Sequence, residues 1–424
     1  MTTHLIEDSY KIAKKKFAKL GVDSDRILEQ LKGISLSIPC WQGDDVGGFE
    51  HPNSELSGGG IMATGNYPGK ARNIKELQKD LITAISLIPG NHRINLHAIY
   101  GDFRGEFIDR DELNIQHFQN WVDWAKKENL KLDFNSTLFS HSLAESGYTL
   151  SSKSPKIRKF WIEHIKRCRE ISETIGRKLN DKVIHNIWIP DGSKDIPVDR
   201  AKHRELLKRS LDEIFQQKLD PNFIQDSLEG KVFGIGSEAF VVGSHEYYLS
   251  YAVKNNLMFT IDSGHYHPNE SVADKISAII PFVKGILLHI SRGLHWDSDH
   301  VPVFNDQLIQ IAEEVIRINA LDKIFIGLDF FDASINRIAA WIIGARATLK
   351  SFLYALLQPQ ETLIEYEEKG KYFQRLGLLE QLKMLPFGSV WDYFCYIHNV
   401  PIGKNWFQDV EEYEQNELRR RKNS

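Results

Sequence analysis

A short stretch in the second half of the chain carries side chains that can bind metal. An apolar run ends at Asp262, a Ser-Gly bend follows, and His265 and His267 come next, on either side of a tyrosine. A carboxylate and imidazoles without a thiolate suit Mn²⁺, Mg²⁺, Co²⁺ or Zn²⁺. Asp262 and His265 are three residues apart across a bend, so both can turn toward neighbouring ions. The stretch predicts one wall of a metal site.

Similar side chains recur near the ends of other apolar runs. Asp297 and Asp299 are two residues apart, so one loop can supply two ligands to one ion. The other candidates are His97, Trp188, Asp191, Glu238, His289, Asp329 and Asp332. Carboxylates that gather in a partly dry site repel one another unless a cation joins them. The set predicts one or two divalent ions, and with two ions Asp262 can bridge.

Each of these signals is weak alone. A single histidine such as His97 or His289 is more often a core residue with satisfied hydrogen bonds, and we place His185 and His300 in that class. Asp-Ser-Asp is also ordinary loop sequence. The metal site is favoured because the candidates recur together at the ends of successive strands.

Eight runs rich in Val, Ile, Leu and Phe predict strands, and each is followed by a loop and a segment with helical periodicity. The runs are 35–42, 93–100, 131–139, 182–190, 231–240, 257–265, 285–292 and 323–331. Helical periodicity is clearest over 73–88, 117–130, 157–176 and 203–219. Strict alternation with near-continuous apolar strands favours a parallel sheet covered by helices. We predict an α/β fold, a (β/α)8 TIM barrel, whose active site lies where the strands end.

An open, doubly wound sheet is the alternative fold. It loses its main support because no GxGxxG follows the first strand and GxxxxGK[ST] is absent. Outside the barrel we predict an N-terminal helix within 1–32 and a long helical C-terminal extension over 335–424. The domains are then 1–334 and 335–424. The extension begins with a very apolar stretch, which must pack on the barrel or meet another subunit.

Charge and cysteine content exclude several classes of protein. Net charge is −4, with 53 basic residues scattered among 57 acidic ones, so no nucleic-acid or membrane partner is expected. Cys40, Cys168 and Cys395 are far apart and lack a CxxC spacing, which indicates reduced thiols. The first residues are amphipathic without an apolar core like that of a signal peptide. A cytoplasmic location is predicted.

Six motifs together resemble the L-rhamnose isomerase family, and they extend over nearly the whole chain. They are WQGDDVGGFE (41–50), ATGNYPGKARN (63–73), LDFN (132–135), IWIPDG (187–192), HWDSDHV (295–301) and GLDFFDASINRIAAW (327–341). The resemblance implies a barrel similar to xylose isomerases, a homotetramer, and interconversion of L-rhamnose and L-rhamnulose as the first step of rhamnose catabolism. It favours a metal-assisted hydride shift on the ring-opened sugar over an enediol.

The resemblance also implies roles for particular residues. A structural Zn²⁺ or Mn²⁺ is expected at Glu238, Asp262, His289 and Asp329. A catalytic Mn²⁺ is expected at His265, Asp297 and Asp299, with Asp262 able to bridge. His97 resembles the family histidine near the ring oxygen or anomeric hydroxyl and is assigned to ring opening, with Asp329 sharing that work through a metal-bound water. His267 is left for a position beside the metal ligands or the substrate.

One expected departure concerns a lysine. Xylose isomerases carry a lysine two residues after the first metal-binding glutamate, where it helps to polarise the substrate carbonyl. Counting from Glu238, the residue at that position is Phe240, which cannot donate a hydrogen bond. A metal or its water is then expected to do that work.

Substrate contacts are predicted at the barrel mouth. The methyl group of a 6-deoxy sugar gains about 0.8 kcal/mol from apolar contact, and Trp41, Val46, Ile99 and Trp188 are placed to supply it. The Gly-rich loop 48–73 is interpreted either as a lid or as an ordered packing loop.

Other functions remain open from the sequence. They are an aldose isomerase with a different sugar preference, a metal-dependent hydrolase on the same barrel, and a sugar-binding protein with structural metal only. A hydrolase acting on DNA would need a basic docking surface, which the charge distribution does not offer. A binding protein is disfavoured because the second ligand group leaves coordination positions open.

Overall fold

Eight parallel strands form a closed barrel in the computed structural model, which describes residues 3–50, 65–231, 239–267, 269–294 and 299–421. Around the barrel the strands follow the order β1-β10-β9-β8-β6-β4-β3-β2. Their bounds are β1 Leu36–Pro39, β2 Arg93–His97, β3 Lys131–Asn135, β4 Val183–Ile187, β6 Ile224–Glu229, β8 Met258–Asp262, β9 Ile286–Ile290 and β10 Ile324–Leu328. The predicted (β/α)8 barrel is confirmed. A separate antiparallel pair is formed by β5 (Gly192–Ser193) and β7 (Phe240–Val241).

The prediction of the fifth barrel strand at 231–240 was wrong. The strand is β6, which ends at Glu229 and pairs with β4 and β8. Its sequence, IQDSLE, is largely polar, yet all six residues are buried. Its acidic and hydroxyl side chains have partners across the barrel wall: Arg169 for Asp226, Thr260 for Ser227 and Asn186 for Glu229. Hydrogen bonds make the burial of these polar side chains tolerable, so the strand forms without an apolar pattern.

The barrel interior changes from apolar to polar toward the ends of the strands. Near the start of the strands, a small apolar cluster is formed by Ile184, Met258, Leu287 and Phe325. One layer higher the side chains bond to one another, with Asn135 donating to Asn95 at 2.7 Å and Thr260 donating to Asn186 at 2.8 Å. Alternate residues of a strand share one face, so the next inward position is the mouth.

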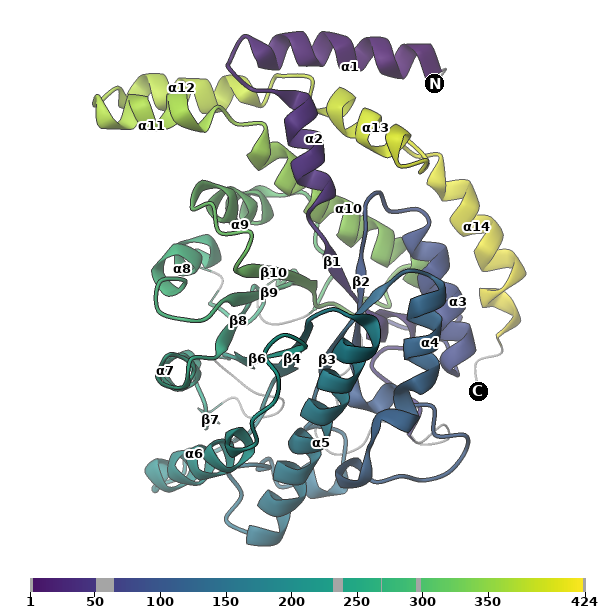
Figure 1. Cartoon of the computed structure of the whole chain (residues 1–424), viewed down its shortest axis with the longest axis vertical. Coiled ribbons are helices and arrows are strands. Elements are labelled where there is room, and N and C mark those ends of the chain that lie inside the picture. Colours follow the sequence, from purple (N-terminus) through teal and green to yellow (C-terminus); the bar gives the residue numbers. More distant parts are fainter. Residues whose placement is uncertain (1–2, 51–64, 232–238, 268, 295–298, 422–424) are drawn as a thin grey trace.

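Helices surround the barrel as predicted (Figure 1). They are α3 Ile74–Ile85, α4 Gln119–Lys127, α5 Pro155–Leu179, α6 Arg200–Gln216, α7 His245–Asn255, α8 Val272–Ile279, α9 Asp306–Arg317 and α10 Arg337–Leu356. Asparagine side chains begin three of them by accepting backbone N–H groups: Asn73 at α3, Asn305 at α9 and Asn336 at α10. These caps fix where the loops at the mouth end.

The two ends of the chain add further helices on one side of the barrel (Figure 1). The N-terminal segment forms two helices instead of one, α1 Thr3–Ala18 and α2 Ser24–Lys32. After α10 come α11 Gln360–Glu368, α12 Tyr372–Leu382, α13 Phe387–Ile397 and α14 Trp406–Asn416. Tyr10 of α1 stacks on Tyr393 of α13 with ring centroids 4.0 Å apart. The chain ends therefore pack on each other as well as on the barrel.

In the described ranges no single helix has the length and apolar character needed to cross a membrane. The pair α10 and α11 meets that test only together, with a bend of 55° between them.

Candidate active site

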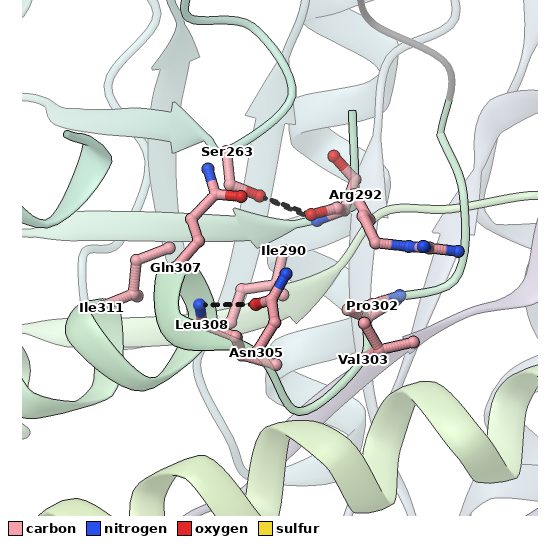
Figure 2. Close-up of a pocket in the computed structure, with 10 residues that line it drawn as sticks. Ser263, Ile290, Arg292, Pro302, Val303, Asn305, Gln307, Leu308 and Ile311 are labelled. Atoms are coloured by element: carbon pink, nitrogen blue, oxygen red, sulfur yellow. Dashed lines mark hydrogen bonds between the residues drawn. The ribbon is translucent and has the colours of Figure 1, made fainter. Parts of the chain in front are cut away.

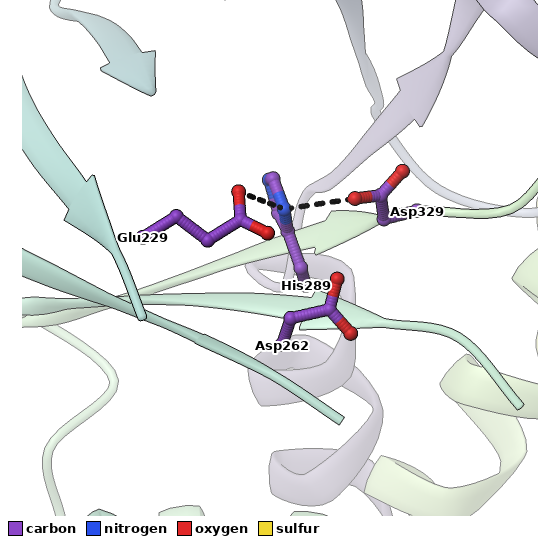
Figure 3. A group of neighbouring side chains, drawn as sticks. All are labelled: Glu229, Asp262, His289 and Asp329. Atoms are coloured by element: carbon purple, nitrogen blue, oxygen red, sulfur yellow. Dashed lines mark ion pairs between the residues drawn. The ribbon is translucent and has the colours of Figure 1, made fainter. Parts of the chain in front are cut away.

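Four side chains from adjacent strands converge at the barrel mouth (Figure 3). Glu229 ends β6, Asp262 ends β8, His289 lies in β9, and Asp329 directly follows β10. One ligand atom from each lies within 4.8 Å of the others. The first three side chains are buried and Asp329 is half-buried. Adjacent parallel strands end at one edge, so residues far apart in sequence form one compact group.

The charges of this group call for a cation. His289 Nδ1 lies 3.1 Å from Asp329 Oδ2 and 3.4 Å from Glu229 Oε2. Burial alone would lower the pKa of His289, but Asp329 and Glu229 raise that pKa well above its usual value. Burial would raise the pKa of Glu229, but His265 and His289 hold it far below its usual range. A protonated imidazole thus offsets carboxylates that otherwise repel one another.

The same group fits a divalent metal. His289 is 1% exposed, and while its Nδ1 faces Asp329 and Glu229, its Nε2 has no hydrogen-bond partner among the described residues. A buried imidazole nitrogen without a hydrogen bond is costly, whereas an unprotonated one is a common metal ligand. With three carboxylates beside it, this donor set suits Mn²⁺, Mg²⁺ or Zn²⁺.

The second predicted metal group is placed only in part. His265 is buried beside the cluster, with Nε2 3.4 Å from Asp262 Oδ2 and Nδ1 3.1 Å from Glu229 Oε1. Asp299 is half-buried, and its carbonyl accepts the backbone N–H of Phe331 at 3.2 Å. Asp297 lies outside the described residues. The second group therefore stays a prediction.

The glutamate in the cluster is Glu229, a residue that the sequence did not single out. Glu238, predicted in its place, lies outside the described residues. The only local signal was an acidic residue followed by glycine at 229–230, in a segment that did not read as a strand. Two residues after Glu229 comes Lys231, so the expected departure at Phe240 does not apply to the glutamate in the cluster. Lys231 is 6% exposed, with Nζ 4.5 Å from the centroid of the Trp188 ring.

Aromatic rings line one side of the site. Trp41 packs edge-on against His97 at 4.8 Å, and Phe139 lies 5.7 Å from His97 and 5.5 Å from Trp188. Trp188 in turn lies 6.5 Å from His265. Phe139 was not predicted, although it ends the third apolar run. This wall brings the predicted Trp41, His97 and Trp188 together beside the metal cluster.

Of the remaining residues predicted to contact the substrate, Val46 and Ile99 are buried and His267 is exposed. Val46 and Ile99 are each 2% exposed. Val46 has a φ of 61° and donates its N–H to the Trp41 carbonyl at 3.1 Å. The carbonyl of Ile99 accepts the N–H of Phe49 at 2.8 Å. His267 is exposed, and its Nδ1 accepts the N–H of Asn269 at 3.3 Å.

Other polar residues near the strand ends have structural partners. Asp191 accepts four hydrogen bonds, from the backbone and hydroxyl groups of Thr149 and Ser151. The His185 ring is fully buried, with Ser136 at one ring nitrogen and Asp226 at the other. His300 Nδ1 lies 3.1 Å from Asp332 Oδ2. His185 is thus the satisfied core histidine that was predicted.

A small cavity lies beside the ends of β8 and β9 (Figure 2). Ser263 donates its hydroxyl to the Ser291 carbonyl, and the Ser291 N–H donates to Ser263, both at 2.9 Å. The Ser291 hydroxyl donates to Asp262 at 3.2 Å. The cavity has room for about one water molecule, so it is too small for a sugar. Its walls instead hold the Asp262 carboxylate in position.

Comparison of the sequence with known proteins gives matches that cover nearly the whole chain. A family model described as L-rhamnose isomerase (RhaA) matches residues 4–421. The L-rhamnose isomerase of Bacteroides thetaiotaomicron is 50% identical over 411 residues, which cover 97% of each chain. That of Listeria monocytogenes is 49% identical over 416 residues, covering 98% of this chain and 99% of its own. That of Rhodopirellula baltica is 49% identical over 419 residues, covering 99% and 98%.

Among solved structures, one of L-ribulose 3-epimerase aligns with a TM-score of 0.48 and 12% identity, over 71% of this chain and 98% of its own. A likeness at this level adds nothing to the fold, which rests on the strand order.

Proposed function

The chain belongs to the L-rhamnose isomerase family and is an aldose–ketose isomerase, and we propose that it acts on L-rhamnose through two divalent metals at the barrel mouth. The observation that carries this proposal is the cluster of Glu229, Asp262, His289 and Asp329. An aldose isomerase with a different sugar preference is the alternative within the same chemistry.

We assign the structural metal, Zn²⁺ or Mn²⁺, to that cluster. The catalytic Mn²⁺ is assigned to His265, Asp297 and Asp299, with Asp262 as the bridge. When bound, the ions supply Lewis acidity toward neighbouring oxygens of the open sugar, which favours movement of a hydrogen between C2 and C1 as a hydride.

The protein's own side chains position the sugar for this step. Lys231 is proposed to donate a hydrogen bond to the substrate carbonyl, as the lysine at the same spacing does in xylose isomerases. His97 is proposed to act in ring opening, with Asp329 nearby. The aromatic wall of Trp41 and Trp188 is proposed to contact the sugar's apolar face and methyl group, since burial of one methyl contributes about 0.8 kcal/mol. Val46 and Ile99 are assigned to the same apolar surroundings. His267 is assigned to a position beside the substrate.

Removal and return of metal tests the reaction. We expect protein treated with a chelator to lose ketose formation from L-rhamnose and to regain it when Mn²⁺ is restored, because the carboxylate cluster needs the cation. Ketose is measured directly, and heat-denatured protein with Mn²⁺ is the blank.

The same samples are offered L-mannose, a phosphodiester and an amide. Turnover of L-mannose in preference to L-rhamnose would support the alternative sugar preference. Hydrolysis with no ketose from any aldose would overturn the proposal.

A homotetramer is proposed, with the extension 335–424 forming part of the interface. Helices α11 and α12 form a hairpin that stands away from the barrel (Figure 1). Helix α12 carries a row of exposed apolar side chains. Its members are Tyr372, Phe373 and Leu376, which are 61%, 79% and 61% exposed. Apolar surface gathered in this way is typical of protein–protein contacts. We propose that the chain has two domains, the barrel with the N-terminal helices over 1–334 and the extension over 335–424.

Replacement of Phe373 and Leu376 by glutamate is expected to lower the oligomeric mass, because buried charges oppose association. Mass is measured by light scattering after size-exclusion chromatography. Val198→Glu, at a fully exposed apolar residue far from α12 in sequence, is the matched control and should leave the mass unchanged. An unchanged mass in the double variant would remove α12 from the interface.

A cytoplasmic location is proposed because Cys40, Cys168 and Cys395 are all buried and unpaired, as is usual in a reducing compartment. The predicted partners are limited to the sugar and further copies of the chain.

A further inference from the structure

Thr137 lies beside the wall of the active site and is held rigidly. It is fully buried, two residues after the end of β3. Its N–H donates to His164 Nε2 at 3.1 Å, and its carbonyl accepts a hydrogen bond from Arg110 at 2.9 Å. Because His164 Nε2 accepts, the ring's other nitrogen carries the proton and donates to the Arg110 carbonyl at 3.0 Å. Both backbone groups of Thr137 are thus fixed by buried side chains.

The hydroxyl of Thr137 faces His97. Oγ1 lies 3.0 Å from His97 Nδ1. Burial lowers the pKa of His97 to about 3, so the ring is neutral and only one nitrogen carries a proton. Within the described parts of the chain, the Thr137 hydroxyl has no second hydrogen-bond partner. Nε2 of His97 also pairs with no described residue. His97 is 9% exposed, and its ring lies in the aromatic wall of the site between Trp41 and Phe139.

The direction of this hydrogen bond follows from the donors and acceptors present. If Nδ1 carried the proton, the hydroxyl oxygen would accept it, and the hydroxyl hydrogen would have no acceptor in a buried position. If the hydroxyl donates to Nδ1, the Thr137 hydroxyl and Nδ1 are both satisfied, and the Nε2 proton is left for an acceptor in the site. A buried donor left without an acceptor is costly, and this cost favours the tautomer in which the hydroxyl donates.

We propose that the Thr137 hydroxyl donates to His97 Nδ1 and thereby keeps the ring proton on Nε2, where it serves as a hydrogen-bond donor to the ring oxygen of the closed sugar. Thr137 is a positioning residue, and its role rests on the proposed function of His97 in ring opening. As the ring opens, the bond between C1 and the ring oxygen breaks and its electron pair stays on that oxygen. The C1 hydroxyl loses its proton and becomes the carbonyl, and water relays that proton to the ring oxygen. The hydrogen bond from Nε2 stabilises the growing negative charge, and His97 is not consumed.

A second hydroxyl–imidazole contact, one residue away, supplies an internal control. Ser136 Oγ lies 2.9 Å from His185 Nε2, and His185 Nδ1 lies 2.8 Å from Asp226 Oδ1. The Asp226 carboxylate only accepts, so His185 carries its proton on Nδ1. His97 and His185 are therefore expected in opposite tautomers within one protein, each beside a hydroxyl from the end of β3.

The tautomers are measured by ¹⁵N NMR on histidine-labelled full-length protein loaded with Mg²⁺, which avoids paramagnetic broadening. The signals are assigned by their loss in His97→Asn and His185→Asn. We expect the proton on Nε2 of His97 and on Nδ1 of His185. A proton on Nδ1 of His97 in the unmodified protein would overturn the proposal, whether or not any variant folds.

Variants of Thr137 test the cause. The nearly isosteric Thr137→Val should reduce the share of His97 with the proton on Nε2, and Thr137→Ser should preserve it. Ser136→Ala removes a hydroxyl at the adjacent position and should leave the His97 tautomer unchanged. An unchanged tautomer in Thr137→Val would overturn the proposal.

Turnover separates this inference from the function of His97. We expect kcat/KM for L-rhamnose to fall about tenfold in Thr137→Val, the effect of one net hydrogen bond, and to recover in Thr137→Ser. A general loss of packing would not be repaired by serine, which lacks the methyl group. The expected tautomer shift with unchanged turnover would support the contact but overturn the role of His97 in ring opening.

Discussion

Replacement of Glu229 by glutamine is expected to lower kcat for L-rhamnose by about 10³-fold, several kcal/mol of transition-state stabilisation, and to leave the barrel folded. Glutamine keeps the size of the side chain and can still bond to Asn186, which donates to Glu229 Oε2 at 2.6 Å. It removes the negative charge that holds a cation beside Asp262 and His289. Metal content per chain is measured by elemental analysis together with the rate.

The matched comparison is Glu238→Gln, because a glutamate at 238 was expected to occupy this place. We expect that variant to retain its metal and most of its activity. If Glu238→Gln loses metal and Glu229→Gln keeps it, the assignment of the structural site to Glu229 is wrong. Loss of metal with retained isomerisation in Glu229→Gln would instead remove this cluster from the reaction.

The second large effect is expected on stability, at Arg169. Its guanidinium donates to the Asp226 carboxylate at 3.0 Å, and also to the carbonyls of Ile214 and Gln217 at 3.0 Å. Arginine and carboxylate are both buried, so Arg169→Met leaves an uncompensated charge in the barrel wall. We expect the free energy of unfolding to fall by about 3–5 kcal/mol, measured by urea denaturation of the metal-loaded protein.

An exposed arginine on the same helix is the control. Arg177 is 51% exposed and pairs with Glu173 at 2.8 Å, so Arg177→Met should change stability by less than about 1 kcal/mol. Adding Asp226→Asn to Arg169→Met should restore part of the loss, because the amide removes the buried charge and still accepts from His185. Equal losses in Arg169→Met and Arg177→Met would contradict this account.

The loss at Arg169 is expected to depend on pH. Burial would raise the pKa of Asp226, but Arg169 and His185 lower it below its ordinary value. In the unmodified protein this stabilisation is present above the ordinary carboxyl pKa and is lost as pH falls through the lower folded value. In Arg169→Met burial dominates and raises the pKa of Asp226. The variant then regains stability as pH falls, so the two proteins should differ most near pH 7 and least toward pH 4.

The fold was predictable where burial follows an apolar pattern. Seven predicted runs contain barrel strands, because strands covered on both faces are rich in Val, Ile and Leu. The strand Ile224–Glu229 was missed because partners distant in sequence satisfy its polar side chains, among them Arg169 from α5 and Thr260 from β8. The hydrophobic pattern of a segment does not show whether a partner distant in sequence will satisfy its polar side chains. Because the fifth strand was expected at 231–240, Glu238 was counted as the metal-binding glutamate and Phe240 as the position of the lysine. The observed strand ends at Glu229, and Lys231 follows two residues later.

By itself, the sequence determined the (β/α)8 class, the family, and the presence of a carboxylate and imidazole site at the ends of the strands. Those properties depend on residue types, local periodicity and long motifs. Only the tertiary structure decided which glutamate joins Asp262, His289 and Asp329, and that Lys231 lies beside Trp188. It also decided that Thr137 faces His97. The physical reason is that strand register and hydrogen-bond partners are set by contacts between residues far apart in the chain, and a pattern in one segment does not contain them.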